Sequence, residues 1–217
     1  YGTKIKTDLQ LRNVSYSSDR KQAYQLVGNT VQMLKRIRGN GPETIVLDGL
    51  KDAKCLYTLK NGSMLAVGAN GVLLVDRNYR VEKKMLHSDH QSIDKRFQNS
   101  LLVDDSILFV GTLDASLIRI NLRDFSTEKI YEISNETKSD ETREYFPLAM
   151  VRVKNAVYFS ENEELYRYSM KTGKVERVHL FNHENTDQII CLAVEDQNKL
   201  WIGTRASGVW SYELTGK

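Results

Sequence analysis

The sequence predicts an all-β protein, namely a β-propeller built from about five four-stranded antiparallel blades. A short apolar strand that ends in a small residue recurs five times along the chain, at spacings of 40, 43, 49 and 43 residues. This spacing matches the blade length of about 40 to 50 residues that is typical of propellers. In addition, no stretch of about 12 or more residues carries a clear helical period. The blades are expected to form either a closed five-bladed ring or part of a larger propeller.

The recurring strand is interpreted as the second strand of each blade. It is clearest at Leu200–Thr204 and closely repeated at Leu108–Thr112, and the small residues that end its copies stand at positions 28, 68, 111, 160 and 203. The best helix candidate, Arg20–Arg36, is interrupted by Gly28-Asn29-Thr30 and is better interpreted as two strands of the first blade.

Flanking strands complete each predicted blade. A short apolar strand and a tight turn precede the recurring strand, as in Cys55–Leu59 followed by Asn61-Gly62, and such turns join the strands of hairpins. A third strand, such as Val72–Val75, and a more polar fourth strand, such as Val81–Met85, follow it. This rise in polarity suits a blade whose first strand faces the propeller axis and whose fourth strand faces water.

We expect one domain or propeller fragment over residues 1–217, with blades at about 12–47, 48–86, 97–133, 147–180 and 187–214. The last blade lacks a fourth strand, and the alternating segment Lys4–Leu11 belongs to no earlier blade. That segment could complete the last blade and close the sheet edge; the alternative is a piece of a longer propeller. Ser134–Phe146, rich in Glu, Lys, Thr and Ser, is expected to be a long solvated loop.

Composition excludes several classes of protein. With 217 residues, 41% of them hydrophobic and 27% charged, the chain is neither disordered nor a small disulfide scaffold. A net charge of +3, with both signs spread along the chain, indicates no nucleic-acid partner. The longest apolar run, Ile189–Val194, is too short to enter a membrane. Cys55 and Cys191 are expected to be buried thiols rather than a disulfide, and no metal or cofactor is predicted.

The last blade resembles a known repeat. Leu192, Leu200–Thr204, Gly208 and Tyr212 agree with the two-component regulator propeller repeat, whereas Asn198 stands where that repeat usually has a turn glycine. The resemblance implies the periplasmic sensor region of a hybrid two-component system, responding to a signal that is often a glycan fragment. It also implies covalently linked signalling domains or a protein partner, with the kinase outside this chain.

One end of the predicted propeller collects polar loops. Loops that join second and third strands share this end with loops that lead from a fourth strand to the next first strand. They carry amides, imidazoles and charges of both signs, which suit an oligosaccharide or another polar ligand. The candidate ligand-binding residues are Asn70, His90, Asp114, Asn185 and Arg205.

No catalytic residue is predicted, and the chain is not expected to be an enzyme. Motifs for serine hydrolases, zinc proteases, P-loops and dinucleotide sites are missing from the sequence. The pair His87 and His90 is interpreted as part of a solvated loop rather than as metal ligands. One alternative is a WD-like protein-interaction scaffold. A less favoured alternative is a propeller glycosidase, whose acids would come from a wider set, Asp89, Asp94, Asp114, Glu161 and Asp187.

Overall fold

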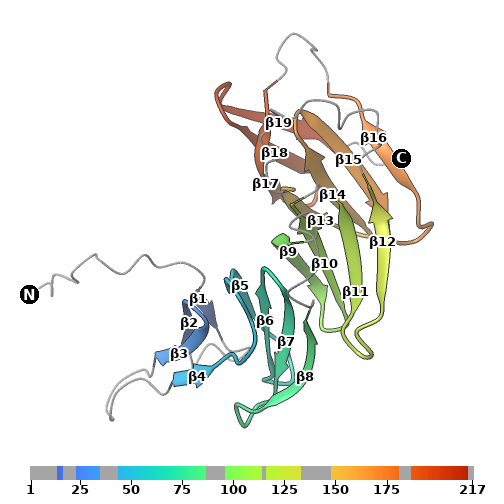
Figure 1. Ribbon diagram of the computed structural model, residues 1–217. Coiled ribbons are helices and arrows are strands. Elements are labelled where there is room, and N and C mark those ends of the chain that lie inside the picture. Colours follow the sequence, from blue (N-terminus) through green and yellow to red (C-terminus); the bar gives the residue numbers. More distant parts are fainter. Residues whose placement is uncertain are drawn as a thin grey trace, which may run out of the picture. The chain divides into compact units, whose positions relative to one another are not determined.

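A computed structural model describes residues 14–16, 23–34, 44–86, 96–113, 116–132, 148–180 and 187–214. All regular structure in these ranges is β-strand, arranged in five antiparallel sheets, so the all-β prediction is confirmed. The chain divides into two compact units, residues 1–89 and residues 90–217, and each is described by itself. We call the sheets blades 1 to 5 in chain order (Figure 1).

Unit 1 contains blades 1 and 2, each with four strands in sequential order. The strands of blade 1 are β1 (Val14–Tyr16), β2 (Ala23–Val27), β3 (Thr30–Leu34) and β4 (Thr44–Val46). Those of blade 2 are β5 (Cys55–Thr58), β6 (Met64–Gly68), β7 (Gly71–Val75) and β8 (Val81–Leu86).

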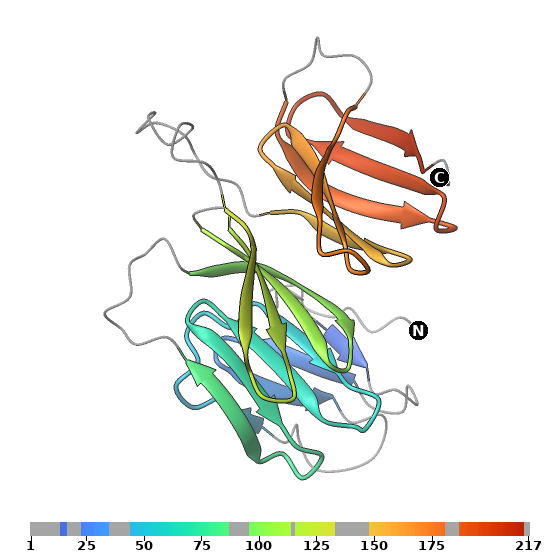
Figure 2. The same ribbon diagram turned by 90° about the vertical axis from the view of Figure 1, so that its right-hand side faces the viewer.

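Unit 2 contains blades 3, 4 and 5, which are coloured from green to red in Figure 2. The strands of blade 3 are β9 (Phe97–Asp104), β10 (Ile107–Thr112), β11 (Leu117–Asn121) and β12 (Thr127–Tyr131), and those of blade 4 are β13 (Met150–Val153), β14 (Ala156–Glu161), β15 (Glu164–Ser169) and β16 (Val175–Val178). Blade 5 has three strands among the described residues, β17 (Ile189–Glu195), β18 (Lys199–Thr204) and β19 (Val209–Glu213). The segments Lys4–Leu11 and Ser134–Phe146 lie outside the described residues.

Burial is highest in the second strands, not in the first strands as expected, because β5, β13 and β17 each contain a single buried residue. Every residue of β6 and of β14 is buried, whereas β8 and β12 are mostly exposed. A central strand with neighbours on both sides and sheets on both faces reads as a continuous apolar run, and a solvated edge strand tolerates charge. The polarity gradient seen in the sequence therefore reflects the position of each strand in its sheet.

Consecutive blades of one unit pack face to face through apolar clusters. In unit 1, Leu26 of blade 1 and Ala66 of blade 2 belong to one cluster. In unit 2, Phe109 of blade 3 meets Tyr168 of blade 4 edge to face, with ring centroids 5.6 Å apart. Burying such faces supplies the main stabilising free energy of each unit, at about 25 cal/mol per Å² of apolar area.

Polar side chains add bridges between blades 3 and 4. The Asn99 amide donates to the Leu148 carbonyl oxygen at 3.0 Å, and the Arg152 guanidinium donates to that of Val103 at 2.6 Å. The two cysteines are free thiols, as predicted, but the expectation that both are buried is wrong, because Cys55 is half-buried and Cys191 is exposed. Among the described residues there is no helix long and apolar enough to span a bilayer.

Candidate functional site

The structure describes two of the five predicted ligand-binding residues. Asn70 lies in unit 1 and Arg205 in unit 2. His90, Asp114 and Asn185 lie outside the described residues. The geometry can therefore be examined at Asn70 and at Arg205, each within its own unit.

Asn70 occupies the turn between β6 and β7, and its amide is already engaged. Its Oδ1 accepts from the backbone N–H of Lys51 at 2.6 Å, and its Nδ2 donates to the carbonyl oxygen of Gly49 at 2.9 Å. Both partners belong to the segment that leads into β5. These bonds give Asn70 a structural role, because a ligand would have to displace them to reach the amide.

Arg205 begins the loop between β18 and β19 and is exposed. Its backbone N–H donates to the carbonyl oxygen of Gln188 at 2.9 Å, and its Nη1 donates to Gln188 Oε1 at 3.3 Å. Gln188 directly precedes β17, so the first strand of the blade holds this loop in place. The guanidinium is thus oriented while it remains open to solvent.

Asp187 fixes the same loop from the neighbouring position. Its Oδ2 accepts from the backbone N–H groups of Ala206, at 2.7 Å, and Ser207, at 2.5 Å. The bond from Ala206 is the main cause that lowers the pKa of Asp187 to about 2, and the bond from Ser207 adds to it. The carboxylate is therefore ionised at neutral pH, which suits an anchor and does not suit the general acid of a glycosidase.

Glu161 stands at the end of β14 and is buried, with 9% of its surface exposed. The Tyr131 hydroxyl, at the end of β12 in blade 3, donates to its Oε2. The rings of Tyr131 and Tyr166 lie 4.9 Å apart, and Phe159 stacks on Tyr166 at 5.4 Å. Burial, followed by the bond to Glu161, raises the pKa of Tyr131 well above its usual range, so its hydroxyl keeps its proton.

Blades 4 and 5 meet at this end through backbone and hydroxyl contacts. The N–H of Ile189 donates to the carbonyl oxygen of Asn162 at 2.7 Å. The Ser160 hydroxyl accepts from the N–H of Ala149 at 3.0 Å and reaches the Ile189 carbonyl oxygen at 3.4 Å. The hairpin that carries Glu161 therefore adjoins the start of β17. We call Glu161, Asn162, Asp187, Gln188 and Arg205 the loop end of unit 2.

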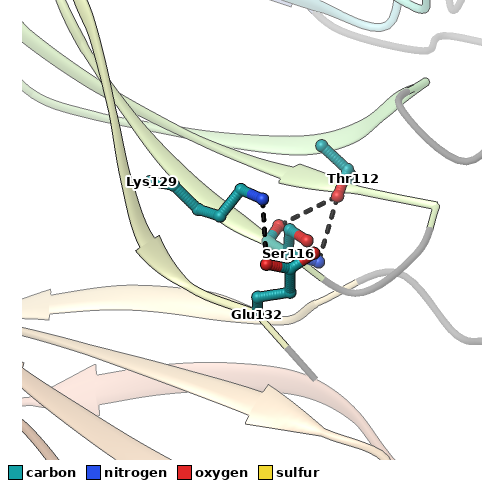
Figure 3. Close-up of polar contacts among 4 residues, drawn as sticks. All are labelled: Thr112, Ser116, Lys129 and Glu132. Carbon is teal, nitrogen blue, oxygen red and sulfur yellow. Dashed lines mark hydrogen bonds and ion pairs between the residues drawn. The ribbon is translucent and has the colours of Figure 1, made fainter. Parts of the chain in front are cut away.

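Blade 3 closes its corresponding loop in a similar way (Figure 3). The Thr112 hydroxyl donates to the carbonyl oxygen of Ser116 at 3.1 Å and accepts from the Ser116 N–H at 3.0 Å. An ion pair between Lys129 and Glu132 lies nearby on the outer strand, with 2.9 Å between Nζ and Oε2. Thr112 and Ser116 thus bond to each other where this loop leaves β10 and enters β11.

This arrangement is suited to binding. Hydrogen-bond donors and acceptors stand on short loops held by rigid sheets, as in many ligand sites. Among the described residues no group of His, Cys, Asp and Glu side chains could hold a metal ion. Sequence reasoning named Glu161 among candidate acids but missed its partner Tyr131.

Comparisons with known proteins give a structural likeness. No protein-family model matches the chain, and no curated protein is similar to it in sequence. The extracellular domain of BT4673 from B. thetaiotaomicron, described as a hybrid two-component system, matches with a TM-score of 0.71 and 15% identity. The match covers 94% of this chain and 28% of that one.

A second structure of the BT4673 extracellular domain, there described as a one-component system, gives a TM-score of 0.65 and 16% identity over 92% of this chain and 26% of that one. At this identity the likeness shows the fold, which is propeller-like. The chain spans little more than a quarter of the length of these neighbours.

Proposed function

We propose that this chain is a sensing part of an extracytoplasmic receptor in two-component signalling. The observation that carries the proposal is the likeness of 94% of the chain to the extracellular domain of a hybrid two-component system. The resemblance of Asn185–Tyr212 to the two-component regulator propeller repeat belongs to the same proposal. A periplasmic location and covalently linked signalling domains belong to the same proposal.

The proposed ligand is a glycan-derived oligosaccharide that binds at the loop end of unit 2. The exposed guanidinium of Arg205 offers N–H donors in a planar arrangement. Its Nη1 donates to Gln188 Oε1 at 3.3 Å, which orients the group. A guanidinium of this kind can donate two parallel hydrogen bonds to neighbouring oxygen atoms. His90, Asp114 and Asn185, which the sequence predicts in loops at the same end of the blades, would add imidazole, carboxylate and amide groups.

The proposed mechanism is binding without catalysis. Arg205 bonds to Gln188, and the N–H of the next residue, Ile189, donates to the Asn162 carbonyl oxygen of blade 4, so a ligand at Arg205 would act on the contact between blades 4 and 5. A ligand shifts a conformational equilibrium only by its difference in affinity for the two states. The signal would be such a shift, passed to domains beyond this chain.

A thermal-shift screen of oligosaccharides tests the ligand. A specific binder at 100 times its dissociation constant should stabilise the folded chain by about 2.7 kcal/mol. Arg205→Ala should abolish that shift. Arg167→Ala is the matched control, because Arg167 lies on β15 in an exposed ion pair with Glu176 at 3.2 Å and should leave the shift unchanged. Loss of the shift in both variants, or in neither, contradicts the site.

A further inference from the structure

Two Asn-Gly dipeptides lie in the two turns that border β6 in blade 2. Asn61-Gly62 stands in the turn before the strand, and Asn70-Gly71 stands in the turn after it. A third, Asn40-Gly41, lies outside the described residues. In such a dipeptide the glycine nitrogen can attack the asparagine side chain, because glycine has no Cβ that would hinder the approach. Two turns of one blade therefore carry the same reactive pair.

The reaction is a deamidation that needs only water and hydroxide. At Asn61 the Gly62 nitrogen loses its proton to hydroxide and forms a bond to Asn61 Cγ. The bond between Cγ and Nδ2 then breaks, and the leaving nitrogen takes a proton from water and departs as ammonia. Water adds to one of the two carbonyl groups of the resulting succinimide ring. Opening of the ring yields aspartate or isoaspartate, so the turn gains a negative charge.

The Asn61 turn has room for this reaction. Asn61 is exposed, and its Oδ1 accepts from the backbone N–H of Ser63 at 2.9 Å. The Gly62 N–H donates to the Leu59 carbonyl oxygen at 3.0 Å. A Cβ placed on Gly62 would meet nothing closer than Arg77 Cβ, at 3.9 Å. The attack therefore requires only that a short surface turn opens, which costs little free energy.

The Asn70 side chain is held by the segment that leads into β5. Its Oδ1 accepts from the Lys51 N–H at 2.6 Å, and its Nδ2 donates to the Gly49 carbonyl oxygen at 2.9 Å. Both atoms bonded to Cγ are thus fixed by backbone groups. Turning Cγ toward the Gly71 nitrogen requires that both hydrogen bonds break.

Gly71 is enclosed by the strands beside it. It is buried and pairs with Gly68 of β6 and with Leu86 of β8, which flank β7 in the sheet (Figure 1). A Cβ placed on Gly71 would collide with the Met85 carbonyl oxygen and would lie 2.9 Å from Leu86 Cα. Closing a succinimide ring reorients the peptide between asparagine and glycine. The backbone of β8 leaves no space for that movement while the sheet is intact.

We propose that Asn61 is a site of spontaneous deamidation and that the fold protects Asn70 in the same dipeptide. The two products would also differ in their fit. Aspartate at position 61 would still accept from the Ser63 N–H. Aspartate at position 70 would place a carboxylate oxygen where Nδ2 now donates to the Gly49 carbonyl oxygen. The modification therefore falls at the turn that tolerates it. The inference does not depend on the proposed ligand.

Peptide mapping by mass spectrometry tests the proposal on the folded 217-residue chain. Trypsin cleaves after Lys60 and Arg77, so one peptide contains both asparagines, and its fragment ions assign each deamidation. During incubation at mildly alkaline pH, Asn61 should be converted faster than Asn70, on the order of tenfold or more, because Asn70 reacts only when its turn opens. In guanidinium the two rates should be similar, because the dipeptide is the same. A digest of the chain before incubation gives the background.

Two further measurements use variants of blade 2. Leu73 is 0% exposed in β7, so Leu73→Ala should weaken the sheet and speed deamidation of Asn70. The rate at Asn61 in the same chain is the internal control and should not change. Asn61→Asp should leave the melting temperature unchanged. Its matched partner Asn70→Asp should lower it, because the bond to Gly49 is lost.

Three results would overturn the proposal. The first is an equal rate of deamidation at Asn61 and Asn70 in the folded chain. The second is an Asn61 that stays intact in the folded chain over a time in which the unfolded chain is converted. The third is a melting temperature that falls as far with Asn61→Asp as with Asn70→Asp, since the turn before β6 would then not tolerate the product.

Discussion

Two glycines at the ends of second strands have different surroundings. A Cβ placed on Gly68 would lie 2.5 Å from the Lys51 carbonyl oxygen and 2.7 Å from Leu50 Cγ. A Cβ on Gly203 would come closest to Cys191 Sγ, at 2.3 Å, and would otherwise meet only ordinary contacts. A backbone oxygen cannot move aside, whereas an exposed thiol can rotate about χ1.

We therefore expect Gly68→Ala to destabilise the fold by about 1 to 3 kcal/mol through overpacking. Gly203→Ala should cost clearly less, because Cys191 can turn away. Urea unfolding followed by circular dichroism measures both. Cys191→Ala combined with Gly203→Ala serves as the control and should remove whatever cost remains. Equal costs for the two single substitutions would show that the contact with the Lys51 carbonyl oxygen does not determine the cost of Gly68→Ala.

In the sequence repeat, Gly68 aligns with Gly111 and Gly203. The backbone hydrogen bonds instead shift the alignment of blade 2 by one residue relative to blades 3 and 5. The backbone N–H groups of Ala69, Leu113 and Arg205 each donate to a carbonyl oxygen in the segment that leads into the first strand of their blade, namely that of Lys51, Arg96 and Gln188. Gly68, which precedes Ala69, therefore corresponds to Thr112 and Thr204. A one-residue shift exchanges the two faces of a strand, and a run as uniformly apolar as β6 carries no alternation that could reveal it.

At the scale of elements, blades 3 and 4 are joined by an aromatic contact that surrounds a buried carboxylate. Tyr131 lies 5.3 Å from Phe159 and 4.9 Å from Tyr166, measured between ring centroids, and its hydroxyl donates to Glu161. The pKa of Tyr131 is raised above the ordinary value of 10.0, mainly by burial and next by Glu161. The folded state therefore favours the protonated phenol.

Tyr131→Phe keeps the ring and removes the hydroxyl. We expect it to destabilise the chain by about 1 to 3 kcal/mol at pH 7, because a buried carboxylate loses a donor. A raised pKa contributes stability that is fully present below the unfolded value near 10 and is lost as the pH rises above it. The free energy of unfolding should therefore fall less between pH 7 and pH 11 in the variant than in the parent chain. Urea unfolding over this pH range measures the difference.

A double-mutant cycle with Glu161→Gln provides the control. In the Glu161→Gln background, where the buried group is neutral, Tyr131→Phe should cost less than in the parent chain. Additive costs would mean that the two side chains are not coupled and that the ring packing alone joins the blades.

Much of this element-scale structure could be predicted from the sequence. Apolar second strands, Asn-Gly turns and polar fourth strands are local patterns, so strands such as β2, β3 and β8 were placed correctly. The Tyr131–Glu161 bond joins residues of different sheets, and no spacing rule connects them. Its one local signal is an acid that directly follows the buried run Ala156–Ser160, which indicates a carboxylate in need of a partner.

At the scale of the molecule, the five sheets belong to two compact units, each with its own apolar clusters. The sequence predicted the number of blades because the repeat is periodic. The period carries no information about which blades belong to the same compact unit. Repeat proteins gain stability mainly from each repeat and its nearest neighbours. Loss of packing in one unit should therefore remain within that unit.

Amide hydrogen exchange with two matched substitutions tests this expectation. Leu165 in blade 4 and Leu73 in blade 2 are both 0% exposed, and Leu→Ala at such sites costs about 2 to 5 kcal/mol. Leu165→Ala should speed exchange in β13–β16 and in the adjoining β9–β12 and β17–β19, and leave β5–β8 unchanged. Leu73→Ala should do the reverse, with faster exchange in β1–β8 alone. Faster exchange in both units for either variant would mean that they open together, because a single cooperative transition gives every core amide the same free energy of opening.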